Sequence, residues 1–122
     1  MQTINVDRAR KLVDVRLTGF LSPEDVAWTG EEVRAAIRTL GDDVGKHVTL
    51  YDVSEIQVAP AATVEALQRT FTNPTVRTMW ARKVAFVTPS ALTRLQVQRL
   101  REAREDIGIF ENRAQAIEWL LD

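Results

Sequence analysis

The sequence contains no cysteine, so disulfide bonds, thiolate nucleophiles and sulfur-ligated metals are excluded from its chemistry. It has one histidine, His47, which follows the polar stretch GDDVGK and precedes a predicted strand, so we expect it to be exposed or half-buried. No apolar run approaches the roughly 20 residues of a membrane-spanning helix. The N-terminus, MQTINVDRARK, lacks the apolar centre of a signal peptide. We therefore expect a cytoplasmic protein without a transmembrane segment.

Residue patterns that indicate catalysis are also scarce. No cluster has the spacing of metal ligands, and a carboxylate pair such as Asp42–Asp43 falls at a helix end, where such groups usually lie in water. Ser90 in TPSAL lacks the glycines of a nucleophile elbow. We therefore expect neither an enzyme nor a bound metal or cofactor. One enzymatic hypothesis stays open, in which Asp52 and His47 lie within hydrogen-bond distance of each other.

Length and charge limit the classes of protein that remain. A chain of 122 residues has the length of one ordinary domain, so we expect a single domain over residues 1–122. The net charge of −1 gives no general reason to expect nucleic-acid binding. Between Arg77 and Arg104, however, Glu102 is the single acid among many bases. These bases either attract acidic faces within the molecule or form a docking surface for an acidic partner.

Alternating apolar and polar residues predict a β-hairpin at the start of the chain. Ile4 and Val6 alternate with polar neighbours, and the polar turn DRAR follows. The same alternation returns at Val13, Val15 and Leu17. Such a pattern is typical of strands with one buried face.

Helices and apolar strands alternate through the rest of the chain. Capping sequences predict helices that begin at Ser22-Pro23, near Pro60, at Ser90 and at Asn112. Strands are predicted at residues 48–53, 84–87 and 107–110. The order is therefore ββαβαβαβα, which predicts an α/β fold with a mostly parallel sheet, right-handed crossovers and an antiparallel N-terminal hairpin.

Helical spacing assigns an inner face to each helix. Gly30 in the first helix would let that helix approach the sheet closely. Arg94, Arg101 and Arg104 are assigned to the polar side of the third helix. The predicted inner residues are, in helix order, Val26, Gly30, Val33, Ile37 and Leu40; Val64, Leu67 and Phe71; Leu92, Leu95, Leu100 and Ala103; and Ile117, Leu120 and Leu121.

Four segments carry a resemblance to a known family. They are LVDVRLTGFLSPEDV, VTLYDVSEI, RKVAFVTPSAL and GIFENRAQAIEWLL. Together they resemble the SpoIIAA-like group of the STAS superfamily (sulphate-transporter and anti-sigma-factor-antagonist domains) over nearly the whole chain. The resemblance implies the STAS-type α/β fold and a bacterial regulatory or protein-interaction role.

The resemblance also implies a site at the loop after the third strand. In anti-sigma-factor antagonists, that loop carries an aspartate and, at the helix start, a pair of serines or threonines and a glycine. A kinase phosphorylates one hydroxyl, and the added charge abolishes partner binding. Asp52 and Ser54 match the pattern, but residues 60–63 read PAAT, so alanine fills the phosphoacceptor position and Thr63 falls about one turn late. The usual switch is therefore expected to be absent.

Asp52 and Ser54 have two interpretations. The carboxyl end of a parallel strand is where open sheets bind ligands, and the following helix N-terminus would favour an anion. Alternatively, both side chains bond neighbouring backbone N–H groups and shape the turn. Trp28, off the apolar stripe of its helix, and Trp80, in TVRTMWARK, are likewise either packing residues or part of a binding surface. Trp119 matches the closing helix of the group and is expected to pack.

Two functions follow from this reading. The first is a non-enzymatic regulatory module that binds a protein partner or associates with itself as a homodimer, through a surface that includes Trp28 or Trp80. The alternative is a binding domain for a small apolar or lipid-like ligand, which requires a mostly apolar cavity between the helices and the sheet.

Overall fold

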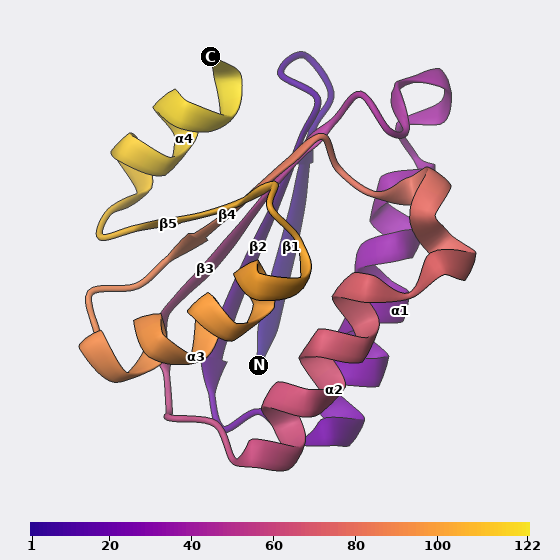
Figure 1. Ribbon diagram of the computed structural model, residues 1–122. Helices are drawn as coiled ribbons and strands as arrows, with labels where there is room; N and C mark the ends of the chain where they lie inside the picture. Colours follow the sequence, from indigo (N-terminus) through magenta and orange to yellow (C-terminus); the bar gives the residue numbers. More distant parts are fainter.

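A five-stranded mixed sheet forms the centre of the computed structural model (Figure 1), which describes residues 1–122 and every side chain except that of Ala103. The strands are β1 (Gln2–Asp7), β2 (Leu12–Gly19), β3 (Val48–Ile56), β4 (Lys83–Val87) and β5 (Ile107–Phe110). Their order in the sheet is β1-β2-β3-β4-β5, with β1 antiparallel to β2 and the other pairs parallel. The predicted hairpin and parallel sheet are confirmed, although β3 runs farther than the predicted residues 48–53.

Four α-helices complete the predicted order. They are α1 (Pro23–Arg38), α2 (Ala61–Thr72), α3 (Ala91–Ala103) and α4 (Arg113–Leu121), with two short 3₁₀ helices, Gly41–Asp43 and Pro74–Met79, between them. Each parallel strand lies next to the one before it in the chain, from β2 to β5. Because the crossovers between parallel strands are right-handed, the connecting helices α1, α2 and α3 all lie on the same face of the sheet. The last helix, α4, lies on the opposite face against β3, β4 and β5 (Figure 1).

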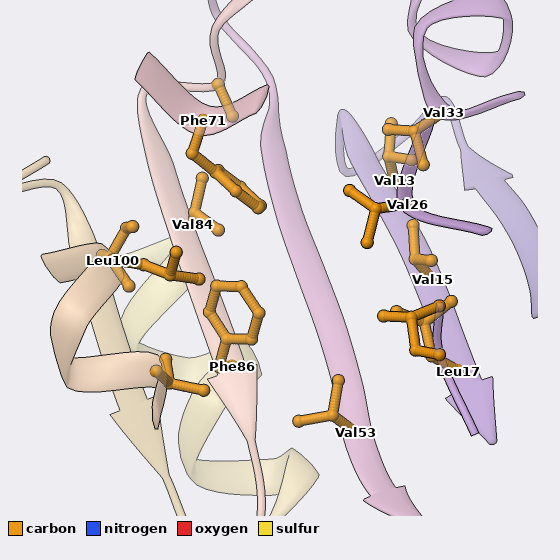
Figure 2. Close-up of a cluster of buried hydrophobic side chains, with 14 of the residues drawn as sticks. Val13, Val15, Leu17, Val26, Val33, Val53, Phe71, Val84, Phe86 and Leu100 are labelled. Atoms are coloured by element: carbon orange, nitrogen blue, oxygen red, sulfur yellow. The ribbon is translucent and has the colours of Figure 1, made fainter. Parts of the chain in front are cut away.

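Two apolar clusters follow from this arrangement, one on each face. The larger lies under α1–α3, and Figure 2 shows part of it, with Val15 and Leu17 projecting from β2, Val53 from β3 and Phe86 from β4. The smaller lies under α4 and comprises Leu12, Val48, Leu50, Ala85, Val87, Ala116 and Leu120. Successive strand residues point to opposite faces, so one strand supplies both clusters.

The predicted cap of α1 is present in full. The Ser22 hydroxyl accepts the Asp25 N–H at 3.1 Å, and the Asp25 carboxylate accepts the Ser22 N–H at 2.9 Å. The role expected of Gly30 is wrong, because the close approach is between two helices and not between α1 and the sheet. A Cβ atom built on Gly30 would lie 3.5 Å from the Thr70 methyl group on α2.

The inner face of α3 differs from the prediction. Leu92 and Leu95 are each 61% exposed, whereas Thr93, Val97 and Leu100 are buried. The helix begins directly after Ser90, and its buried residues repeat at the four- and three-residue spacing of one helical face. A shift of one residue rotates a helix by about 100°, which turns both leucines to solvent.

The last helix also buries a different set of residues from the predicted one. Leu121 was predicted to face inward but is 40% exposed, because Ala116 and Leu120 form the buried stripe of α4. The predicted inner position of Ala103 lies outside the side chains that the structure describes.

Candidate functional site

The predicted position of Asp52 at the carboxyl end of its strand is wrong, because Asp52 is the middle residue of β3. Its side chain lies on the α4 face of the sheet, like those of Val48 and Leu50. One carboxylate oxygen accepts the Ser54 N–H at 3.1 Å. The other accepts a hydrogen bond from the Arg113 guanidinium at 3.1 Å and lies 3.7 Å from Nη2 of Arg16. Asp52 is buried and has three internal partners, so the turn-shaping interpretation describes its contacts.

Arg113 joins two acidic residues across the sheet. It is the first residue of α4 and pairs with both Asp52 and Asp14. Burial opposes ionisation of Asp52, but hydrogen bonds from Ser54 and Arg113 outweigh burial and lower the pKa of Asp52. The bond to Asp14, helped by that to Asp52, raises the pKa of Arg113. Asp52 is therefore an ionised anchor for the start of α4.

The hydroxyl groups of the β3–α2 junction differ sharply in access. Thr63 is fully buried, and its hydroxyl donates to the Leu21 carbonyl at 2.9 Å. Ala61 and Ala62 are exposed, so the start of α2 presents methyl groups to solvent. Ser54 is exposed and is the accessible hydroxyl at the end of β3. The structure thus separates the two candidate residues: Ser54 stays a candidate for contact with other molecules, and Thr63 serves as an internal donor.

The two candidate tryptophans have different surroundings. Trp28 is 56% exposed on the outer side of α1. Trp80 is partly buried beneath Arg104, whose guanidinium carbon lies 4.2 Å from the centre of the indole ring. Trp119 packs against Phe110 at 5.4 Å between ring centroids, as expected.

An apolar surface that the sequence did not indicate flanks the loop before α2. Val58 is 52% exposed, and Leu92 and Leu95 are exposed on neighbouring α3; we call these three residues the α3 patch. The Gln96 side chain holds α3 to the loop, because it accepts the Ala59 N–H at 3.1 Å and donates to the Ala59 carbonyl at 2.7 Å. The helical spacing of the two leucines predicts a core position, whereas the structure places both in solvent. The available signal was Val97, an apolar residue three positions before Leu100, which together with Leu100 marks the buried face of α3.

The basic stretch is divided between internal and solvent-facing roles. Arg82 donates to the Leu120 carbonyl at 3.1 Å, and Lys83 donates to the Trp119 carbonyl at 2.8 Å. The expected outward position of Arg104 is wrong, because this residue is buried. Among the described side chains, three arginines of α3 form no ion pair, namely Arg94, Arg99 and Arg101.

A mostly apolar cavity lies between the sheet and α1–α3, with a volume of about 70 Å³. Its walls include Leu17, Val53 and Phe86 of the sheet, together with residues of each covering helix. Gln57 and Gln96 are among the few polar lining residues. Pockets for drug-sized ligands typically measure roughly 300–1,000 Å³, so the cavity in this conformation suits a much smaller molecule.

Comparisons with known proteins bear on the fold. No model of a known protein family matches the chain, and no curated protein matches it. One similar solved structure is an uncharacterized DUF3478-family protein with a SpoIIAA-like fold from Shewanella loihica PV-4, with a TM-score of 0.69 and 16% identity over 98% of this chain and 93% of that one. Another is an anti-sigma factor antagonist from Mycobacterium paratuberculosis, with a TM-score of 0.59 and 15% identity over 100% of this chain and 96% of that one. The chain has the SpoIIAA-like fold.

The SpoIIAA-like fold of this chain does not bring Asp52 and His47 together. His47 immediately precedes β3 and Asp52 is the middle residue of that strand, so at about 3.3 Å per residue they are on the order of 16 Å apart. The predicted exposure of His47 is also wrong, because the ring is fully buried and its Nδ1 accepts the Gly45 N–H at 3.0 Å. Burial lowers the pKa of His47, so the ring is neutral at pH 7.

In the described residues, no group of three or more histidine, cysteine, aspartate or glutamate side chains is placed to hold a metal ion. No helix in the described part of the chain is long and apolar enough to cross a membrane.

Proposed function

We propose that this SpoIIAA-like domain is a non-enzymatic, cytoplasmic bacterial regulatory module that binds an acidic protein partner through the α3 patch. The observation that carries the proposal is the exposure of Val58, Leu92 and Leu95 beside the β3–α2 junction. A structural neighbour described as an anti-sigma factor antagonist supports a regulatory role.

The energetics of the α3 patch favour association. Burying an exposed leucine side chain stabilises a complex by about 1.5–3 kcal/mol before the losses of association are subtracted. Leu92 and Leu95 are adjacent on one helix face, so one partner surface can cover both. Arg94, Arg99 and Arg101 lie on the same helix, where their positive charge would steer an acidic partner toward the patch.

Regulation by phosphorylation at the start of α2 is not part of this proposal. The accessible side chains there are the methyl groups of Ala61 and Ala62, and the Thr63 hydroxyl is bonded to Leu21 inside the protein. Partner binding is therefore proposed to be independent of a modified hydroxyl at this helix terminus.

The test compares partner capture by the wild-type domain and by a Leu92→Gln/Leu95→Gln variant. Glutamine keeps the helix propensity of these positions and removes their apolar surface. Leu121→Gln is the matched control, because Leu121 is also an exposed leucine at 40% but lies on α4. We expect the control to capture a partner protein that the double variant does not capture. The affinity of the purified domain for that partner should fall as the salt concentration increases.

Two outcomes would count against this function. Equal capture by all three proteins would exclude the α3 patch as the docking surface. A wild-type homodimer that becomes monomeric in the double variant would show that the patch binds a second copy of the domain instead of an acidic partner.

A second candidate function is the binding of a small apolar ligand, which the cavity under α1–α3 favours. The cavity is lined mainly by apolar side chains, as this function requires. Native mass spectrometry of the purified protein would detect a co-purified small molecule. Replacing Val53, which lines the cavity, with phenylalanine should fill the space and abolish that species while the domain stays folded.

A further inference from the structure

A second cavity of about 70 Å³ adjoins the apolar cavity and differs from it in charge. Five residues line both spaces, namely Gly30, Val33, Tyr51, Thr70 and Phe71. The second cavity is also lined by Arg34 and Arg104, and none of its lining residues is acidic. An apolar space therefore continues into one with positively charged walls.

Arg104 forms a fixed wall of the second cavity. Its Nε donates to Asp106 at 3.0 Å, and a second nitrogen of the guanidinium pairs with the same carboxylate. The guanidinium also stacks on Trp80 and lies 5.8 Å from the ring centre of Phe71. The charge of Arg104 is thus largely satisfied by Asp106.

Arg34 supplies a positive charge that has no such partner. Among the described residues, no carboxylate forms an ion pair with Arg34. Its side chain folds back over Gly30, because a Cβ atom built on that glycine would lie 3.3 Å from Nη1 of Arg34. The glycine therefore gives the guanidinium room to lie at the cavity wall instead of extending into water.

Two uncharged donors lie in the same wall. The Trp80 indole N–H is buried and has no acceptor among the described residues. Burial raises the pKa of Tyr51 to about 12, with the charges of Arg104 and Arg34 acting in the opposite direction, so the phenol keeps its proton at neutral pH. A guanidinium, a phenol and an indole N–H are all hydrogen-bond donors, so the wall favours a ligand group that only accepts.

We propose that the two cavities form one site for a short-chain aliphatic carboxylate, with the alkyl chain in the apolar cavity and the carboxylate at Arg34, Tyr51 and Trp80. The proposal rests on the second candidate function, the binding of an apolar ligand. A planar carboxylate matches the donor geometry of one free guanidinium. Together the cavities approach the roughly 150 Å³ that admits benzene in an engineered protein core, which limits the chain to a few carbons unless the helices move apart.

The test is calorimetric titration of the full chain with butanoate and hexanoate, each beside its uncharged amide. We expect the carboxylates to bind about 10- to 100-fold more tightly than the amides, as a charge-assisted hydrogen bond implies. Arg34→Gln should remove that preference. Arg38→Gln is the matched control, because it makes the same change one turn along α1 at an exposed residue that lines neither cavity. Gly30→Ala should weaken carboxylate binding by displacing the Arg34 side chain.

The outcomes separate this proposal from the one on which it rests. Equal binding of carboxylate and amide would overturn carboxylate recognition while leaving the apolar site in place. Binding of neither ligand would overturn both. An equal loss of carboxylate affinity in Arg34→Gln and Arg38→Gln, with circular dichroism showing both variants folded, would assign the preference to overall charge and also overturn the proposal.

Discussion

Replacing Thr63 with valine tests whether the hydroxyl at the start of α2 belongs to the interior. Thr63 is fully buried, and its hydroxyl donates at 2.9 Å to the Leu21 carbonyl, far away in the sequence. Valine has nearly the same shape, so the substitution opens no cavity. It does leave a buried carbonyl without its donor, which costs about 1–3 kcal/mol. We expect the free energy of unfolding to fall by about 2 kcal/mol on that basis.

Urea denaturation followed by tryptophan fluorescence measures this loss. Thr39→Val is the matched control, because the Thr39 hydroxyl donates to the Ala36 carbonyl at an exposed position where water can replace it. The control should change stability by no more than about 0.5 kcal/mol. A Thr63→Val protein as stable as the wild type, or a kinase that phosphorylates Thr63 in the folded domain, would refute the assignment of this hydroxyl to the interior.

Two further predictions concern ionisable groups. Burial raises the pKa of Asp52, but hydrogen bonds from Ser54 and Arg113 outweigh burial and lower that pKa below 3.8. The ionised carboxylate therefore stabilises the folded state at pH values above the unfolded pKa. This stability is lost as the pH falls through the pKa of the folded state. The ion pair of Arg113 with Asp52 is partly exposed, so Arg113→Gln should lower the unfolding free energy at pH 7 by only about 1 kcal/mol. Denaturation at several pH values should also show a weaker loss of stability in acid. An unchanged dependence on acid pH would contradict this role of Arg113. Burial lowers the pKa of His47 below its ordinary 6.5, so the unfolded chain takes up the proton first and stability falls as pH drops from about 7 toward the folded value. His47→Asn keeps a side-chain acceptor for the Gly45 N–H. The variant should lose no stability between about pH 7.5 and 5.5, where the only histidine is the main titrating side chain. If the variant still loses stability in this range, a group other than His47 is responsible.

The elements of the fold were predictable because their signals are local. The alternation at Val13, Val15 and Leu17 places these residues on one face of β2, and the Ser22–Asp25 capping box fixes the start of α1. The buried face of α3 was harder to predict from the sequence. Leucines at 92, 95 and 100 satisfy an approximate helical spacing, yet the helix turns only Leu100 inward, since Thr93 and Val97 share its stripe.

The site residues were harder to predict because their partners are distant in the chain. Asp52 was identified as a candidate, but its partner Arg113 lies in the last helix and also contacts Asp14 near the start. A basic helix residue beside two strand carboxylates becomes visible only when the sheet order is known. The burial of Arg104 was hard to predict for the same reason. Arg104 contacts Asp106 and Trp80, and the contact with Trp80 depends on how α3 packs over the sheet.

The measurement that tests the central claim most directly is native mass spectrometry of the domain gently purified from bacterial cells, beside the Leu92→Gln/Leu95→Gln variant. The claim is that the domain acts by holding a partner on the α3 patch. We predict a complex of the wild-type chain with a protein of acidic composition, and its disappearance in the double variant but not in Leu121→Gln. The same species for wild type and double variant, or a monomer alone in both, would contradict the account.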